Sequence, residues 1–228
     1  MKTGVLLIHG FTSHRSSLEA LLPELDRCGL EWRYPILAGH GSQPKDLSDR
    51  RWHHWQADVE RGYQELRQTH DRVVIIALSM GTLLALELAI GHPDHVAGLV
   101  LLSPAVKFKN PFAPLTPVIA PIIPRMRFPA TDRYSAKQYA QKDRGYPWFP
   151  TAPFHSYWKR TRAILGEVRT VRCPVRIIQS RVDKVADPRG AQALYDALPG
   201  KKALFWHEVS GHEMLLDAET ADVLQEIL

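Results

Sequence analysis

Residues 72–89 read RVVIIALSMGTLLALELA, and this stretch determines what the rest of the chain is expected to form. The continuous run of Val and Ile before Leu78 predicts a parallel strand buried on both faces, and the Leu- and Ala-rich segment after Gly81 predicts a helix packed against it. Ser79 lies at the junction. A sharp turn from strand to helix leaves little room beside the hinge, which fits the small residues Ala77 and Gly81. We therefore expect Ser79 to occupy a tight, strained corner with its hydroxyl pointing outward.

The pattern around this serine is Ala-x-Ser-x-Gly rather than the stricter Gly-x-Ser-x-Gly. An ordinary serine at the end of a strand gives the same local pattern, so the motif by itself leaves the role of Ser79 open. The next residue, Met80, places a backbone N–H in the first turn of the helix. Unpaired donors and the helix dipole favour negative charge there, so this N–H is suited to an oxyanion.

The remaining chain alternates between strand-like and helix-like segments. Apolar runs at residues 5–8, 32–35, 96–102, 173–179 and 202–206 predict further strands. Strands that alternate with helical patterns predict an α/β fold, in which a mostly parallel central sheet is flanked by helices on both faces. With 228 residues and 45% hydrophobic content, the chain can bury one sizeable core.

Segment 104–170 has a different texture, because prolines recur among aromatic and basic residues without a regular period. Such a segment cannot form a central strand, and its many aromatic side chains are unlike a solvated loop. We therefore predict that residues 1–103 and 171–228 form the core and that 104–170 is a cap inserted over the carboxyl edge of the sheet. A mobile loop is the alternative. The segment from Tyr157 to Val168 is expected to be a helix that leads back to the core.

The net charge of +5 is concentrated in this insert, which holds 12 Lys and Arg against 3 Asp and Glu, whereas the remainder holds 17 against 21. No nucleic-acid-binding motif accompanies these charges, so we predict no nucleic-acid partner. A solvated cationic face explains the bias, and so does a face that attracts anionic groups or a lipid surface.

The sequence also carries indications of its cellular location. No apolar stretch reaches the roughly 18 residues that a membrane span needs, and the opening strand-like run is too short for a signal peptide. Cys28 and Cys173 lie far apart and match no metal or redox spacing. Reduced thiols in a cytoplasmic protein are the expectation.

Three polar residues follow predicted strands, namely Ser79, Asp183 and His212. Ligands and catalytic groups of open parallel sheets gather beyond the carboxyl ends of the strands. A serine hydroxyl needs a base to become nucleophilic, and an imidazole with a pKa of about 6.5 can take the proton and return it to a leaving group. A buried carboxylate would fix the ring's tautomer and stabilise the imidazolium. The order Ser, Asp, His along the chain is that of one known triad architecture.

Other residues compete for these roles. His9 and His40 lie beside glycines and are expected to bond to backbone groups within their turns. Asp187 and Asp217 compete with Asp183, but Asp187 is placed to cap a helix and Asp217 is predicted to lie inside the last helix. No spacing of Cys, His and Asp resembles a zinc site, so we expect no metal and no other cofactor.

These motifs resemble the α/β-hydrolase superfamily, and most closely its branch of small bacterial carboxylesterases and monoacylglycerol lipases. The matching segments are LLIHGFT at 6–12, PILAGHG at 35–41, Trp55-x-x-Asp58-Val59, the turn at Ser79, Val182-Asp183-x-x-Val185-x-x-Pro188 and Ser210-Gly211-His212. The resemblance covers nearly the whole chain. It implies that Ser79 is the nucleophile, Asp183 the acid and His212 the base. It also implies that the backbone N–H groups of Phe11 and Met80 form the oxyanion hole.

The chain departs from the family pattern in two places. Ala77 replaces the commoner glycine, which the superfamily tolerates, and the cap aligns poorly with known relatives. The first departure leaves the chemistry unchanged, whereas the second leaves the substrate open.

The resemblance implies a serine hydrolase that cleaves small-molecule or lipid esters through an acyl-enzyme on Ser79. Short- to medium-chain acyl esters are the expected substrates, with monoacylglycerols among the candidates. The alternatives are a thioesterase or another acyl hydrolase with the same triad, and a non-catalytic binding protein on the same scaffold. Cap residues such as Phe112 and Trp148 are expected to form the apolar walls of the substrate pocket. The oligomeric state is not predicted.

Overall fold

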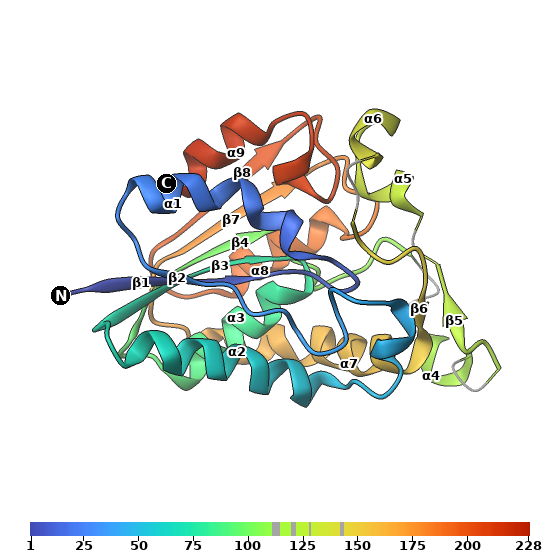
Figure 1. The fold of residues 1–228 in the computed structure, drawn as a ribbon, viewed down its shortest axis with the longest axis horizontal. Coiled ribbons are helices and arrows are strands. Elements are labelled where there is room, and N and C mark those ends of the chain that lie inside the picture. Colours follow the sequence, from blue (N-terminus) through green and yellow to red (C-terminus); the bar gives the residue numbers. More distant parts are fainter. Residues whose placement is uncertain (111–114, 120–121, 128, 142–143) are drawn as a thin grey trace.

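The computed structural model describes residues 1–110, 115–119, 122–127, 129–141 and 144–228. Among them, a six-stranded sheet with the strand order β2-β1-β3-β4-β7-β8 forms the centre of the molecule (Figure 1). Its strands are β1 (Thr3–Ile8), β2 (Trp32–Arg33), β3 (Arg72–Leu78), β4 (Val96–Leu102), β7 (Val175–Ser180) and β8 (Lys202–His207). Each neighbouring pair in this order is parallel. The predicted α/β fold with a parallel central sheet is confirmed.

Helices cover both faces of this sheet. One face carries α2 (Trp52–Arg67), α3 (Met80–Gly91), α7 (Thr151–Glu167) and α8 (Pro188–Ala197), and the other carries α1 (Leu22–Arg27) and α9 (Thr220–Ile227). Successive side chains of a strand point to opposite faces. Accordingly, Ile75 and Ala77 of β3 join the hydrophobic cluster on the first face, whereas Ile76 and Leu78 join the cluster on the second.

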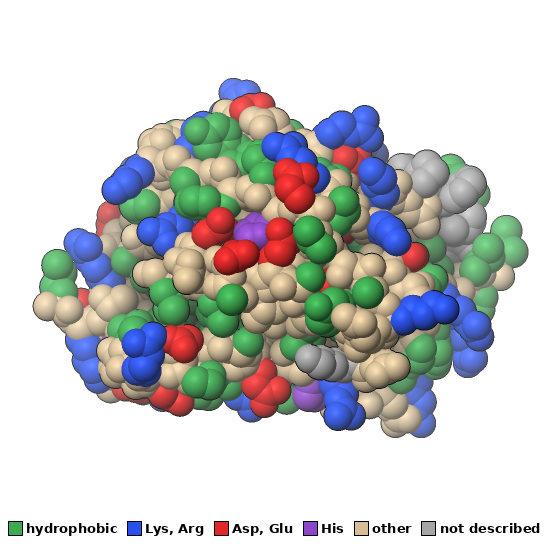
Figure 2. All heavy atoms as spheres, turned by 90° about the horizontal axis from the view of Figure 1, so that it is seen from above, with side chains coloured by type: hydrophobic (Ala, Val, Ile, Leu, Met, Phe, Trp, Pro, Cys, Tyr) green, Lys and Arg blue, Asp and Glu red, His purple; other side chains and the backbone are tan. Residues whose placement is uncertain are grey.

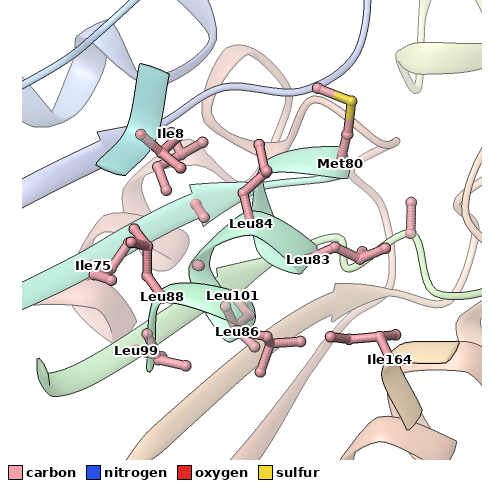
Figure 3. Close-up of a cluster of buried hydrophobic side chains, with 14 of the residues drawn as sticks. Ile8, Ile75, Met80, Leu83, Leu84, Leu86, Leu88, Leu99, Leu101 and Ile164 are labelled. Carbon is pink, nitrogen blue, oxygen red and sulfur yellow. The ribbon is translucent and has the colours of Figure 1, made fainter. Parts of the chain in front are cut away.

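Helix α3 is buried on nearly every side, as expected for a helix that is apolar all round. It lies between the sheet and the helices α2 and α7. Figure 3 shows part of this cluster, with Leu86 of α3 next to Ile164 of α7. The residue at its N-terminus, Ser79, is therefore attached to a helix that is buried in the core.

The strand order places a topological switch point between β1 and β3. From β1 the chain moves to β2, toward one edge of the sheet, whereas from β3 it moves to β4, toward the opposite edge. Crevices at such points, beyond the carboxyl ends of the strands, are where open α/β sheets bind ligands. The segment after Ile8 and the turn at Ser79 meet there.

The described part of the predicted insert forms two regions. The described residues of 104–150, called the cap segment below, lie beyond the carboxyl ends of the strands (Figure 1). The cap segment contains α4 (Thr116–Ile119), α5 (Ala130–Arg133), α6 (Lys137–Ala140) and the strand β5 (Arg125–Met126), which pairs with β6 (Phe149–Pro150). In contrast, α7 lies in the helical layer of the core. There Trp52 Nε1 donates to Glu87 Oε2 at 2.9 Å, and Arg160 of α7 forms an ion pair with the same carboxylate. The division at residues 104 and 170 stays a prediction.

Two helix predictions differ from the structure. Helix α7 begins at Thr151 rather than near Tyr157. Before β2, a 3-10 helix, η1 (Arg15–Leu21), leads directly into α1. The prediction that Asp217 lies inside the last helix is wrong, since it lies between the 3-10 helix η5 (Met214–Leu216) and α9.

Candidate active site

The turn at Ser79 is as tight as the sequence predicted. Ser79 has a φ of 55° and a ψ of −118°, a conformation that L-residues adopt only under strain. A Cβ on Gly81 would lie 2.6 Å from the carbonyl oxygen of Ile8, and a Cβ on Gly10 would lie 3.0 Å from Ser79 Cβ. The two glycines therefore allow the end of β1 and the start of α3 to pack directly against each other.

Ser79, His212 and Asp183 form one chain of hydrogen bonds. The Nε2 atom of His212 lies 2.8 Å from Ser79 Oγ, and its Nδ1 atom lies 2.8 Å from Asp183 Oδ2. All three side chains are buried. Their loops follow β3, β8 and β7, so the carboxyl ends of three strands contribute one residue each. This geometry allows a proton to move from the hydroxyl to the ring while the carboxylate holds the ring in place.

The carboxylate of Asp183 is fixed within its own turn. Its Oδ1 atom accepts from the N–H groups of Val185 at 2.8 Å and Ala186 at 3.0 Å. Its Oδ2 atom, which faces His212, also accepts from Gln179 Nε2 at 3.1 Å. Such bonds stabilise an anion and orient it toward the ring.

The pKa of His212 reflects two opposing effects. Burial of the ring favours its neutral form, but the negative charge of Asp183 and the hydrogen bond to it outweigh burial. The pKa of His212 is therefore raised above its ordinary value of 6.5. An imidazolium formed during proton transfer is stabilised by the same carboxylate.

The two expected oxyanion donors lie on either side of Ser79. Met80 begins α3, so its N–H has no acceptor within the helix. Phe11 follows Gly10 and lines the cavity beside Ser79. Among the described residues, no hydrogen bond occupies the N–H of Phe11. The oxyanion role of Phe11 and Met80 stays a prediction that these placements support.

Two buried histidines fix the loop that carries Phe11. His9 Nε2 accepts from the N–H of Leu37 at 3.1 Å, and His40 Nε2 accepts from the N–H of Thr12 at 3.1 Å. Burial lowers the pKa of His9 to about 4, and it lowers the pKa of His40 well below 6.5, so both rings are neutral and can accept these bonds. Each ring also bonds within its own turn, as predicted, because His9 Nδ1 donates to the Gly10 carbonyl oxygen at 2.9 Å and His40 Nδ1 donates to the Leu37 carbonyl oxygen at 3.2 Å.

A cavity of about 20 Å³ lies beside Ser79, large enough for about one water molecule. Aromatic rings of Phe11, Phe108 and Tyr157 and the charged side chains of Arg133 and Glu213 line it. Burial raises the pKa of the Tyr157 hydroxyl, which therefore stays protonated beside the serine. An acyl chain does not fit this cavity unless its walls move.

Of the two pocket residues named from the sequence, Trp148 is not part of this lining. Trp148 is half-buried elsewhere, with the Arg125 guanidinium 4.6 Å from the centre of its ring. Phe112 lies outside the described residues. The walls that the sequence analysis did not identify, Phe108 and Tyr157, belong to an aromatic-rich stretch in which no periodicity indicates which rings face the serine.

The rival acids have other functions. Asp187 caps α8 by accepting from the N–H of Arg189 at 3.0 Å, as predicted. The Asp217 carboxylate binds backbone groups of the His212 loop and the cap segment rather than the imidazole. Within the part of the chain that the structure describes, no group of three or more His, Cys, Asp or Glu side chains is arranged to hold a metal ion.

A family of proteins described as serine aminopeptidase, S33 matches residues 1–219. The chain belongs to this family. A thermostable monoacylglycerol lipase from Bacillus sp. (strain H-257) is 29% identical over 226 residues, which cover 99% of this chain and 88% of that protein. A carboxylesterase from Bacillus subtilis (strain 168) is 25% identical over 229 residues, which cover 98% of this chain and 89% of that protein.

One similar solved structure is described as belonging to LipS and LipT, two metagenome-derived lipolytic enzymes. It has a TM-score of 0.92 and 26% identity, and the match covers 99% of this chain and 91% of that chain. The resemblance to the esterase and monoacylglycerol lipase branch of the α/β-hydrolases is thereby confirmed.

Proposed function

We propose that this chain cleaves carboxylic esters through an acyl-enzyme formed on Ser79. It is a carboxylesterase- or lipase-like serine hydrolase. The observation that carries the mechanism is the continuous hydrogen-bond chain from Ser79 Oγ through His212 to Asp183, with 2.8 Å at each link.

In this mechanism Ser79 Oγ attacks the ester carbonyl and its proton passes to His212 Nε2. The N–H groups of Phe11 and Met80 stabilise the tetrahedral oxyanion. His212 then protonates the departing alcohol, and the acyl group remains on the serine. A water molecule, deprotonated by the same imidazole, releases the acid and restores the hydroxyl.

The substrate class is proposed from the relatives. The family description names an aminopeptidase, whereas the two relatives above are named as a monoacylglycerol lipase and a carboxylesterase. We therefore favour short- to medium-chain acyl esters, including monoacylglycerols. A thioesterase would use the same triad, and a binding protein could retain it without turnover.

A fluorophosphonate probe tests the nucleophile. The wild-type protein should become labelled once per chain, and Ser79→Ala should not. Absence of labelling in the wild type would favour the binding protein. A series of p-nitrophenyl esters of increasing acyl length, monoacylglycerols and matched thioesters then defines the substrate. Faster cleavage of the thioesters would favour the thioesterase.

The cap segment has features of a lipid-contacting surface. Its large apolar side chains include Leu115, Val118, Ile122 and Ile123, which are 48%, 70%, 79% and 46% exposed. Exposed Arg125 and Arg127 follow directly. At this end of the molecule, Figure 2 shows Lys and Arg side chains beside hydrophobic ones. Exposed apolar groups next to cations suit the surface of a lipid dispersion, so we propose that the cap segment makes peripheral contact with lipid.

No helix in the described residues has the length and apolar character needed to cross a bilayer. The thiols of Cys28 and Cys173 are both free, the first exposed and the second buried. Free thiols support the proposal that the protein works in a reducing compartment such as the cytoplasm.

A further inference from the structure

Asp217 is a buried carboxylate that the catalytic mechanism does not use. Both of its oxygens are occupied by donors. Its Oδ2 atom accepts from the N–H of Gly211 at 2.8 Å and from the N–H of Ser135 at 2.6 Å. Its Oδ1 atom accepts from the N–H of Ala218 at 2.8 Å and from the Ser135 hydroxyl.

These bonds join two segments that are far apart in the sequence. Gly211 immediately precedes His212, whereas Ser135 belongs to the cap segment. The two backbones are in direct contact, because a Cβ on Gly211 would lie 2.6 Å from the carbonyl oxygen of Arg133. The N–H of Glu213 also donates to that same oxygen at 3.0 Å. The cap segment therefore lies along the loop that carries the proposed base.

We propose that Asp217 is a positioning residue, which holds His212 at hydrogen-bond distance from Ser79 by linking the His212 loop to the cap segment. This inference rests on the proposed triad. Asp217 makes no bond to the imidazole, whose Nδ1 atom is already paired with Asp183. It acts instead through the backbone N–H of Gly211, one residue before the ring. Bonds from backbone N–H groups to a buried carboxylate are stronger than bonds between neutral groups, so they suit such a link.

An amide in place of this carboxylate cannot satisfy the same donors. Each oxygen of Asp217 accepts from at least one backbone N–H, so whichever way an Asn side chain turns, its NH₂ group faces a donor. A buried N–H left without an acceptor forces the loop to move. A displacement of about 1 Å at a catalytic group can cost about 100-fold in rate.

The test compares Asp217→Asn with Asp222→Asn, a matched change at an exposed carboxylate in α9. Turnover of a short p-nitrophenyl ester is measured per active site, titrated with the fluorophosphonate probe. Asp217→Asn should lower kcat by roughly 10- to 100-fold with little change in KM, whereas Asp222→Asn should match the wild type. The low-field proton resonance of the His212–Asp183 bond should shift or broaden only in Asp217→Asn.

Ser135 supplies a milder test that does not depend on the folding of Asp217→Asn. Ser135→Ala removes only the hydroxyl donor and should lower kcat by roughly 2- to 10-fold, and Ser135→Thr, which keeps the hydroxyl, should restore it. The double variant with Asp217→Asn and Ser135→Ala should be no slower than Asp217→Asn alone, because both changes break the same contact.

Wild-type kcat per titrated site in both Asp217→Asn and Ser135→Ala, with an unchanged resonance, would overturn the positioning role. A failure of the triad itself is recognised separately, since Ser79→Ala would then still be labelled by the probe or turn over ester.

Discussion

The serine end of the candidate site is held by packing within the core, whereas the histidine end is held by contacts with the cap segment and by the side chains of Ser103 and Asp217. Ser79 lies between a buried strand and a buried helix, and Gly10 and Gly81 bring the neighbouring backbones into contact. His212 lies in a loop after β8, where the Ser103 hydroxyl donates to its carbonyl oxygen at 2.9 Å and Asp217 holds the preceding residue. The proposed nucleophile is thus fixed by the core, and the proposed base can respond to the cap segment.

The largest expected effect comes from removing either the Ser79 hydroxyl or the His212 imidazole. Ser79→Ala and His212→Ala should each lower kcat by about 10⁴- to 10⁶-fold, and the double variant should be no slower, because the two groups act as one unit. Steady-state kinetics on a soluble ester measure all three. Losses that multiply in the double variant would contradict the assignment of a shared role.

Removal of the acid should affect only the histidine end. Asp183→Asn is expected to lower kcat by about 10³- to 10⁴-fold with the fold intact, since the amide would select the wrong tautomer of His212. The matched variant Asp187→Asn removes charge from a helix cap and should keep kcat near the wild-type value. If Asp187→Asn proved the more damaging of the two, the acid would have been assigned to the wrong residue.

The serine end should instead be sensitive to added volume. Gly81→Ala places a methyl group 2.6 Å from the carbonyl oxygen of Ile8, and we expect it to lower the free energy of unfolding by about 1–3 kcal/mol. Gly91→Ala, in the same helix, adds a methyl group with no atom within 4 Å and should not destabilise the protein. Urea denaturation of both variants measures the difference. Equal free energies of unfolding for the two variants would show that the close contact between Gly81 and Ile8 does not determine the stability of the protein.

The sequence predicted the serine end better than the histidine end for a physical reason. The apolar strand, Ser79 and Gly81 lie within ten residues, so this local pattern is enough to predict the packing that shapes the turn. The parallel sheet and the three catalytic candidates followed from the same alternation of segments.

The contacts that hold the histidine end join residues far apart in the chain. Ser135 meets Asp217 across 82 positions, and Ser103 meets His212 across 109. Ser103 has a φ of 45°, yet nothing in the sequence around it indicates this conformation. The ring of Phe108 lines the cavity beside Ser79 because of how the cap segment folds, and a proline-rich stretch without periodicity does not predict that fold. Tyr157 reaches the same cavity from α7.

The pH dependence of activity should report the electrostatics of the histidine end. His212 acts as a base only when neutral, and its pKa is raised above 6.5, so kcat/KM should rise as the pH increases through a value above 6.5. The stabilising pairing of charged His212 with Asp183 is fully present below the unfolded pKa of 6.5 and is lost as the pH rises through the folded pKa. In Asp183→Asn the rise of kcat/KM should move to lower pH, because burial of the ring then dominates the pKa of His212. A rise at the same pH in both proteins would show that another group controls it.

The smallest expected effect concerns the outer surface of the cap segment. Arg127 is exposed and follows the apolar side chains of Ile122 and Ile123. A cation close to an anionic lipid surface contributes about 1 kcal/mol to binding, so Arg127→Ala should lower activity on anionic lipid dispersions by about fivefold at low salt. Activity on a soluble ester should not change, because Arg127 does not line the cavity beside Ser79. Added salt should reduce the difference, since charges are screened over about 10 Å at 0.1 M. Equal, salt-insensitive rates of both proteins on neutral and anionic lipid would show that the basic residues of the cap segment do not recruit lipid and are only exposed to solvent. Val118→Asp, at a 70% exposed apolar position, would then test whether the apolar side chains of the cap segment alone contact lipid.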